Sequence, residues 1–195
     1  MEIISDIEDD ALKNEDIYLN ILNRLKNSCL PDFEFEKRLR GNIYKDNVDV
    51  TRYLLCSLAE SEMTNETHNN LWDRQRSGTY VWTIEHIFPE GDNIPQVWVD
   101  MIANGDKNLA HEYLEKYVHT IGNLTMTGYN STLSNLSFEK KRDRQDKEGR
   151  YVGYRNGFSI NKELANKNSW TVEDIQCRTD DLVGKLLILF AFPEE

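Results

Sequence analysis

The sequence predicts an α+β fold that is mostly helical, and three observations support this class. Apolar residues recur at helical spacing near both ends of the chain. Only two short segments, residues 80–84 and 119–126, have the β-branched and aromatic or alternating character of strands. With 195 residues, 39% of them hydrophobic, the chain is long enough to bury a core. We therefore expect a helical protein that contains one small pair of strands.

The first part of the chain has the pattern of two helices. Apolar side chains at helical spacing from Ile7 to Leu25 predict the first helix, and Pro31 ends it. The apolar stretch from Val50 to Leu58 predicts a second, largely buried helix. Residues 60–77 are polar and predict a loop or an irregular helix. We interpret residues 1–78 as a helical segment.

Residues 79–195 are expected to form a second unit that combines the two strands with further helices. A helical insertion over residues 96–117, interrupted near Asn104 and Gly105, separates the two predicted strands. Residues 130–144 resume a helical pattern after the second strand.

A last helix is expected over residues 170–192. Thr171 or Ser169 can serve as its N-cap, and Pro193 closes it. The sequence contains no internal repeat that we recognise and no linker rich in glycine and serine.

Composition excludes several classes of protein. With 10 Gly and 4 Pro the chain is neither collagen-like nor of low complexity. No apolar run approaches the roughly 18 residues of a membrane span, and the acidic start is unlike a signal peptide. Cys29, Cys56 and Cys177 are scattered, which favours buried thiols in a reducing compartment. We expect a cytoplasmic protein without a membrane partner.

The net charge of −11 argues at first against a nucleic-acid partner. Residues 137–155 depart from this balance, with 7 Lys or Arg against 4 Asp or Glu. Alternating charges of this kind are typical of a solvated helix face. A strip that contacts phosphates is the other interpretation of the same residues.

Three segments in the second unit carry side chains suited to phosphodiester chemistry. They are Thr83-Ile-Glu-His-Ile-Phe-Pro89, His119-Thr-Ile-Gly-Asn-Leu-Thr125, and Tyr129-Asn-Ser-Thr-Leu-Ser-Asn135, which runs into Phe138-Glu-Lys-Lys-Arg142. Near neutral pH a histidine can take a proton from water. A carboxylate and an amide oxygen can hold Mg²⁺, and nearby Lys or Arg can offset phosphate charge.

Each of these residues also has a purely structural interpretation. Glu85 and His86 alone resemble a polar pair at a strand end, and His119 before a strand is more often structural than a ligand. Asn123 after a glycine fits a turn, and Asn130 fits a helix cap. The functional interpretation depends on their order and combination.

Taken together, the three segments closely resemble the HNH-like nuclease domain at the C-terminus of GmrSD-type or phosphorothioate-sensing restriction proteins. Those domains belong to the ββα-metal, or His-Me finger, nucleases. The resemblance covers roughly residues 50–192 and includes flanking positions such as Tyr53 and Trp170. It implies a ββα-metal core with a helical insertion and a C-terminal helix.

The resemblance also implies roles for single residues. His86 would be the general base, Asn130 a metal ligand on the helix, and Asn123 the residue that braces the hairpin. Glu85 stands where many such sites place an acidic ligand, but adjacent strand residues point to opposite faces, so Glu85 and His86 share a metal only if the strand ends or bulges. Candidates for DNA or phosphate contact are His119, Lys140, Lys141, Arg142 and Arg144, with Asn135 behind the site.

The leading functional hypothesis is a Mg²⁺- or Mn²⁺-dependent DNA endonuclease that nicks DNA and belongs to a bacterial anti-phage restriction system acting on or beside modified DNA. The resemblance implies a ParB-like NTPase or modification-sensing partner domain, and nothing in residues 1–75 resembles one. The alternative is a catalytically degenerate module that binds DNA or protein. A nuclease that acts on RNA differs from the leading hypothesis only in substrate.

Overall fold

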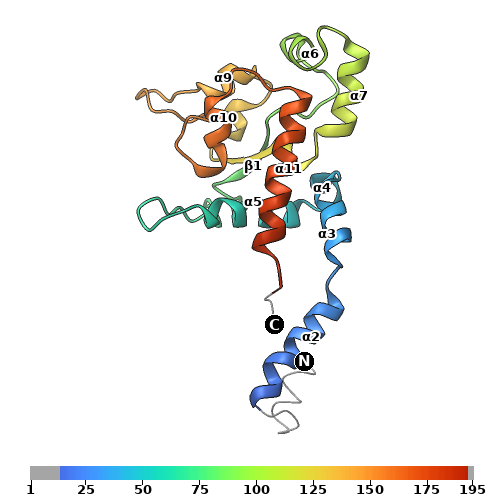
Figure 1. Cartoon of the computed structure of the whole chain (residues 1–195). Coiled ribbons are helices and arrows are strands. Elements are labelled where there is room, and N and C mark those ends of the chain that lie inside the picture. Colours follow the sequence, from blue (N-terminus) through green and yellow to red (C-terminus); the bar gives the residue numbers. More distant parts are fainter. Residues whose placement is uncertain (1–13, 193–195) are drawn as a thin grey trace.

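The computed structural model describes residues 14–192 and confirms the mostly helical α+β class (Figure 1). One two-stranded sheet lies among helices, and α2 extends away from the others. The longer helices are α2 (Asn14–Ser28), α3 (Asp32–Leu39), α5 (Val48–Ser61), α6 (Gln96–Ala103), α7 (Lys107–Tyr117) and α11 (Val172–Leu189). The short ones are α4 (Ile43–Asp46), α8 (Asn130–Leu133), α9 (Phe138–Arg142) and α10 (Lys162–Asn166), with 3₁₀ turns η1 (Ile121–Asn123) and η2 (Ser159–Asn161).

The sheet is an antiparallel pair, β1 (Thr83–His86) and β2 (Leu124–Thr127), in which Glu85 pairs with Thr125 and His86 with Leu124. Side chains alternate between the two faces of a strand, so Glu85 and His86 point to opposite sides. The side chains of Glu85 and His86 therefore contact different neighbours on the two faces of β1.

Several predicted boundaries move in the structure. The first predicted helix begins in residues outside the described part, and its described portion, α2, ends at Ser28, ahead of Pro31. Pairing of β1 begins at Thr83, because Tyr80 belongs to a separate bridge with Arg74. The predicted closure of the last helix at Pro193 also lies outside the described residues.

The helix predicted over residues 130–144 is two short helices. Ser134 has a φ of 36°, a conformation that a helix interior does not contain. The Ser137 hydroxyl then accepts the backbone N–H of Lys140 and starts α9. The apolar pattern is continuous through this region, but the backbone conformation of Ser134 and the N-cap at Ser137 divide it into two helices.

The other expected helices form as predicted. Asn104, at a φ of 50°, and Gly105, at a φ of 89°, separate α6 from α7. Thr171 caps α11 in a capping box with Asp174. The expected largely buried helix is α5, whose buried face includes Leu55.

The predicted division at residue 78 does not separate two cores. Leu54, Leu55 and Cys56 of α5 pack in one cluster with Leu124 and Met126 of β2 and with Leu182, Val183 and Leu186 of α11. The helical segment from α3 onward is therefore part of the packing that supports the sheet. In Figure 1, α11 passes beside α5, and the two helices are in contact.

The three cysteines are free, but only Cys56 is buried as expected, while Cys29 and Cys177 are exposed. Among residues 14–192, no helix has the length and apolar character needed to cross a membrane.

Gly122 is required by the close approach of η1 to α11. A Cβ at this position would lie 2.2 Å from both the Ile175 carbonyl and the Thr179 hydroxyl. Gly122→Ala should therefore lower the free energy of unfolding by about 2 kcal/mol or more, as overpacking does. The matched control is Gly184→Ala in the middle of α11, where nothing lies within 4 Å of the added Cβ. It should stabilise the chain by about 0.5–1 kcal/mol, and urea denaturation measures both. Equal effects of the two alanines would contradict this packing.

Candidate active site

His86 lies at the end of β1 among aromatic side chains and is 8% exposed. Its Nε2 is 3.2 Å from Nδ1 of His119, and its Nδ1 is 3.5 Å from a carboxylate oxygen of Glu90. Tyr44 of α4 stacks on the His119 ring at 5.5 Å and meets the His86 ring edge-on at 4.6 Å. The structure thus brings two of the predicted site residues into direct contact.

Burial keeps His86 neutral. Desolvation, with smaller contributions from the charges of His119 and Lys141, lowers the pKa of His86 to about 3. A neutral imidazole has a lone pair that can accept a proton, which the general-base role requires.

Asn123 is fully buried and holds the chain that follows β1. Its amide oxygen accepts the backbone N–H of Phe88 at 2.8 Å and the indole N–H of Trp170 at 3.2 Å. Its amide nitrogen donates to the carbonyls of Phe88 and Val118. Asn123 therefore braces the segment beside His86 through these four hydrogen bonds.

Glu85 and Lys141 form a buried ion pair on the other face of β1. The Lys141 ammonium donates to Glu85 Oε1 at 2.6 Å, to the carbonyl of His86 at 2.7 Å and to that of Ile87 at 3.1 Å. Burial raises the pKa of Glu85 to about 6 and lowers that of Lys141. With three acceptors and no exposed surface, Lys141 cannot contact phosphate. The predicted phosphate contact of Lys141 is therefore wrong, and its ammonium group instead links α9 to the end of β1.

Asn130 begins α8 on the other side of the sheet end, half-buried against β1. Its Nδ2 donates to the carbonyl of Ile84 at 2.6 Å, and its amide oxygen accepts no hydrogen bond from a described residue. It lines a groove of about 440 Å³ between α8 and residues 75–83.

The side-chain oxygens of Asn130 and Glu85 differ in how well they suit a bound magnesium ion. The amide oxygen of Asn130 fits a hard cation, because Mg²⁺ prefers oxygen ligands and keeps several positions for water. Glu85 as it lies does not fit, because Lys141 already neutralises its carboxylate and only 2% of it is exposed. In the described part of the chain, no three His, Cys, Asp or Glu side chains are placed to hold a metal.

The remaining predicted residues divide by exposure. Asn135, Lys140 and Arg144 are exposed. Arg142 is 8% exposed and donates to the carbonyl of Lys167 and to the side chains of Asn168 and Asp143. This corrects the phosphate-contact prediction for Arg142, whose guanidinium joins α9 to the loop before α11.

His119, the neighbour of the predicted base His86, and the predicted ligand Asn130 line two different cavities. His119 lines a cavity of about 520 Å³ with Glu90, Asp92, Glu115 and Lys45. Asn130 lines the groove near Thr83, at the opposite end of β1.

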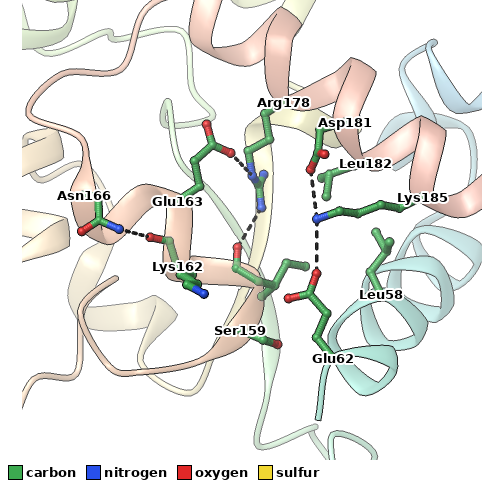
Figure 2. A pocket seen from close by; sticks show the side chains of 11 residues that line it. Leu58, Glu62, Ser159, Lys162, Glu163, Asn166, Arg178, Asp181, Leu182 and Lys185 are labelled. Atoms are coloured by element: carbon green, nitrogen blue, oxygen red, sulfur yellow. Dashed lines mark hydrogen bonds and ion pairs between the residues drawn. The ribbon is translucent and has the colours of Figure 1, made fainter.

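Three residues that support this region were not predicted. Tyr44 and Glu90 contact His86, and only Glu90, directly after Thr83–Pro89, lies near a recognised motif. Arg178 of α11 is fully buried, and its guanidinium donates to the carbonyls of Gly122 and Leu124 on either side of Asn123. Figure 2 shows Arg178 at the wall of a cavity of about 360 Å³, beside Glu163. Arg178 belongs to the flanking pattern of the resemblance, but that pattern assigned it no role.

The adjacent lysines of α9 provide a matched pair for mutation. Lys141→Ala leaves Glu85 buried without its partner, so it should lower the free energy of unfolding by about 3–5 kcal/mol. Lys140→Ala changes an exposed side chain and should alter stability by less than about 0.5 kcal/mol. Thermal and urea unfolding measure both, and equal losses would show that Lys141 is not the buried partner of Glu85.

The depressed pKa of His86 predicts acid sensitivity. Its folded-state pKa of about 3 lies below the ordinary value of 6.5. The folded chain therefore binds fewer protons than the unfolded chain, and the stabilisation is complete above pH 6.5 and is lost as the pH falls toward 3. The free energy of unfolding should drop by about 2 kcal/mol from pH 7.5 to pH 5 because of this group. His86→Asn should remove that drop, while His111→Asn at an exposed position should keep it. A slope that survives in His86→Asn would assign it to other groups.

Comparison with known proteins identifies the family of the chain. No curated protein and no solved structure matches it. A family model does match, described as the C-terminal domain of GmrSD restriction endonucleases, and it covers residues 31–185. The match includes α3 to α10, most of α11 and the candidate site residues. The chain therefore belongs to the family of GmrSD restriction endonuclease C-terminal domains.

Proposed function

We propose that the chain is a metal-dependent, HNH-type DNA endonuclease that cuts one strand at a time. Membership of a restriction endonuclease family supports hydrolysis of DNA. The observation that carries the chemistry is the neutral His86 paired with His119 at the end of β1. Because the chain has one such histidine pair, a double-strand break requires two encounters or two copies.

In this proposal His86 takes the proton from the attacking water. With a proton on Nδ1 facing Glu90, the Nε2 lone pair accepts the hydrogen bond from His119 Nδ1, so His119 has to move aside before Nε2 can take the proton from water. A pKa of about 3 makes His86 a weak base in the free chain. A phosphate anion bound next to the imidazole raises this pKa toward the range useful for catalysis, since an opposite charge favours the protonated form.

We propose Mg²⁺ or Mn²⁺ as the cofactor, with the amide oxygen of Asn130 as its protein ligand. The support is that this oxygen is a hard donor without a partner among the described residues. A bound divalent ion would neutralise charge on the phosphate and on the departing oxygen. The protein itself positions the two side chains: Asn130 is held by its hydrogen bond to Ile84, and His86 by its contact with His119.

The wider setting follows from the family and is also a proposal. We infer a role in a bacterial anti-phage system in the cytoplasm, acting on or beside modified DNA. Recognition of the mark is assigned to a ParB-like partner domain.

Two observations favour the alternative, a degenerate module that binds DNA or protein. His119, which contacts His86, and Asn130 line different cavities, and Glu85 is ion-paired with Lys141. Binding of DNA without any cleavage would support it.

Conversion of supercoiled plasmid to open circles tests the proposal. The wild-type chain should nick with Mg²⁺ or Mn²⁺ and not with EDTA. His86→Asn and Asn130→Ala should each reduce the rate by about 10²–10⁴-fold, the range for removal of a catalytic acid or base. His68→Ala, at an exposed histidine, serves as the control and should cut normally. Equal activity of His86→Asn and the control would exclude His86 as the base, and an inert wild type that still binds DNA would favour the degenerate module.

A further inference from the structure

The structure contains a short internal repeat that the sequence did not suggest. Residues 73–81 and residues 144–152 form two hairpins of the same geometry, which we call the first and second hairpins. Each is closed by one bridge, Arg74 with Tyr80 and Gln145 with Tyr151. Each turns through a glycine in the left-handed region, Gly78 at a φ of 85° and Gly149 at 79°.

The backbone hydrogen bonds of the two hairpins correspond one to one. Gln75 N–H donates to Thr79 and Asp146 N–H to Arg150, at 2.8 and 3.0 Å. When Gln75 is matched with Asp146 and Gly78 with Gly149, Arg76 of the first hairpin corresponds to Lys147 of the second. Both are exposed, and neither makes an ion pair within residues 14–192. Each hairpin therefore presents one unpaired cation at its tip.

Both hairpins are fixed at their base. Arg52 donates to the carbonyls of Leu71 and Trp82, one on each side of the first hairpin, and lies 3.6 Å from the Tyr80 ring centre. In the second hairpin, the last strand leads into Tyr154, whose backbone N–H donates to the carbonyl of Lys141. A fixed base and an exposed tip allow a side chain to be held out at a defined place.

The first hairpin lies beside the start of α8. The first hairpin shares with Asn130 the groove of about 440 Å³, which Gln75 and Tyr80 also line. Figure 1 shows both segments projecting on the same side of the molecule, away from α6 and α7.

We propose that the two hairpins form a two-pronged clamp on the phosphate backbone of a nucleic acid duplex, with Arg76 and Lys147 as the contacts. The inference rests on the proposed function, and it adds the surface that holds the substrate. Charge complementarity supports it, because in a chain of net charge −11 the second hairpin belongs to the basic segment 137–155. Asp146 and Glu148 hold Arg150, which leaves Lys147 and the exposed Arg144 uncompensated.

Fluorescence anisotropy of a labelled duplex in EDTA, measured over a series of salt concentrations, tests the clamp separately from cleavage. Arg76→Ala and Lys147→Ala should each weaken binding, and each should reduce the slope of log affinity against log salt by about 1. The double variant should bind about tenfold more weakly at low salt. Lys107→Ala, at an exposed lysine on α7 on the other side of the molecule, should leave both quantities unchanged. Thermal unfolding should be the same for all variants.

The outcomes separate this inference from the proposed function. If the wild-type chain nicks plasmid but the tip variants bind duplex as Lys107→Ala does, the clamp is wrong and the nuclease stands. If the wild-type chain neither binds duplex nor nicks it, both fail. Binding of an acidic protein but not of duplex would also overturn the clamp.

Discussion

The arrangement of this region depends on one buried ammonium group. Lys141 joins α9 to β1 through a carboxylate and two successive carbonyls, those of His86 and Ile87. A buried backbone carbonyl without a hydrogen-bond donor destabilises the fold, and these two carbonyls at the end of β1 would otherwise lack a donor. By satisfying them, Lys141 fixes the point where β1 ends. Asn123 then holds Phe88, and the segment that begins with His86 is bound from two sides.

The helical segment before the sheet takes part in the same arrangement. Tyr44 of α4 packs against both imidazoles, and its backbone N–H donates to the carbonyl of His119 at 3.3 Å. Removal of water from His86 therefore depends on a residue that lies about forty positions earlier in the chain. The family match from residue 31 agrees with this, since it includes α4. The segment and the strands form one structural unit around the histidine pair.

The sequence predicted those features that have a local chemical cause. The break near Asn104 and Gly105 and the N-cap at Thr171 follow from residue types. What it missed depends on tertiary contacts. Lys140 and Lys141 are equivalent in a charged run, and only the packing of α9 on β1 buries one of them. The two hairpins share only the short pattern Gly-x-Tyr-Val, at residues 78–81 and 149–152, which is too brief to indicate a repeat before the backbone geometry is known.

The Glu85 and Lys141 pair also limits how a divalent ion can be held. If Glu85 became a ligand, Lys141 would have to leave or remain close to a second cation, and separating a buried pair costs about 3–5 kcal/mol. Two cations on one carboxylate in a medium of low dielectric repel each other strongly. Asn130 faces no such competition, because its oxygen has no cationic partner among the residues described. Substrate phosphate oxygens can complete the coordination of Mg²⁺, which often keeps few protein ligands. An ion held by Asn130 and the phosphate therefore costs the fold less than an ion at Glu85.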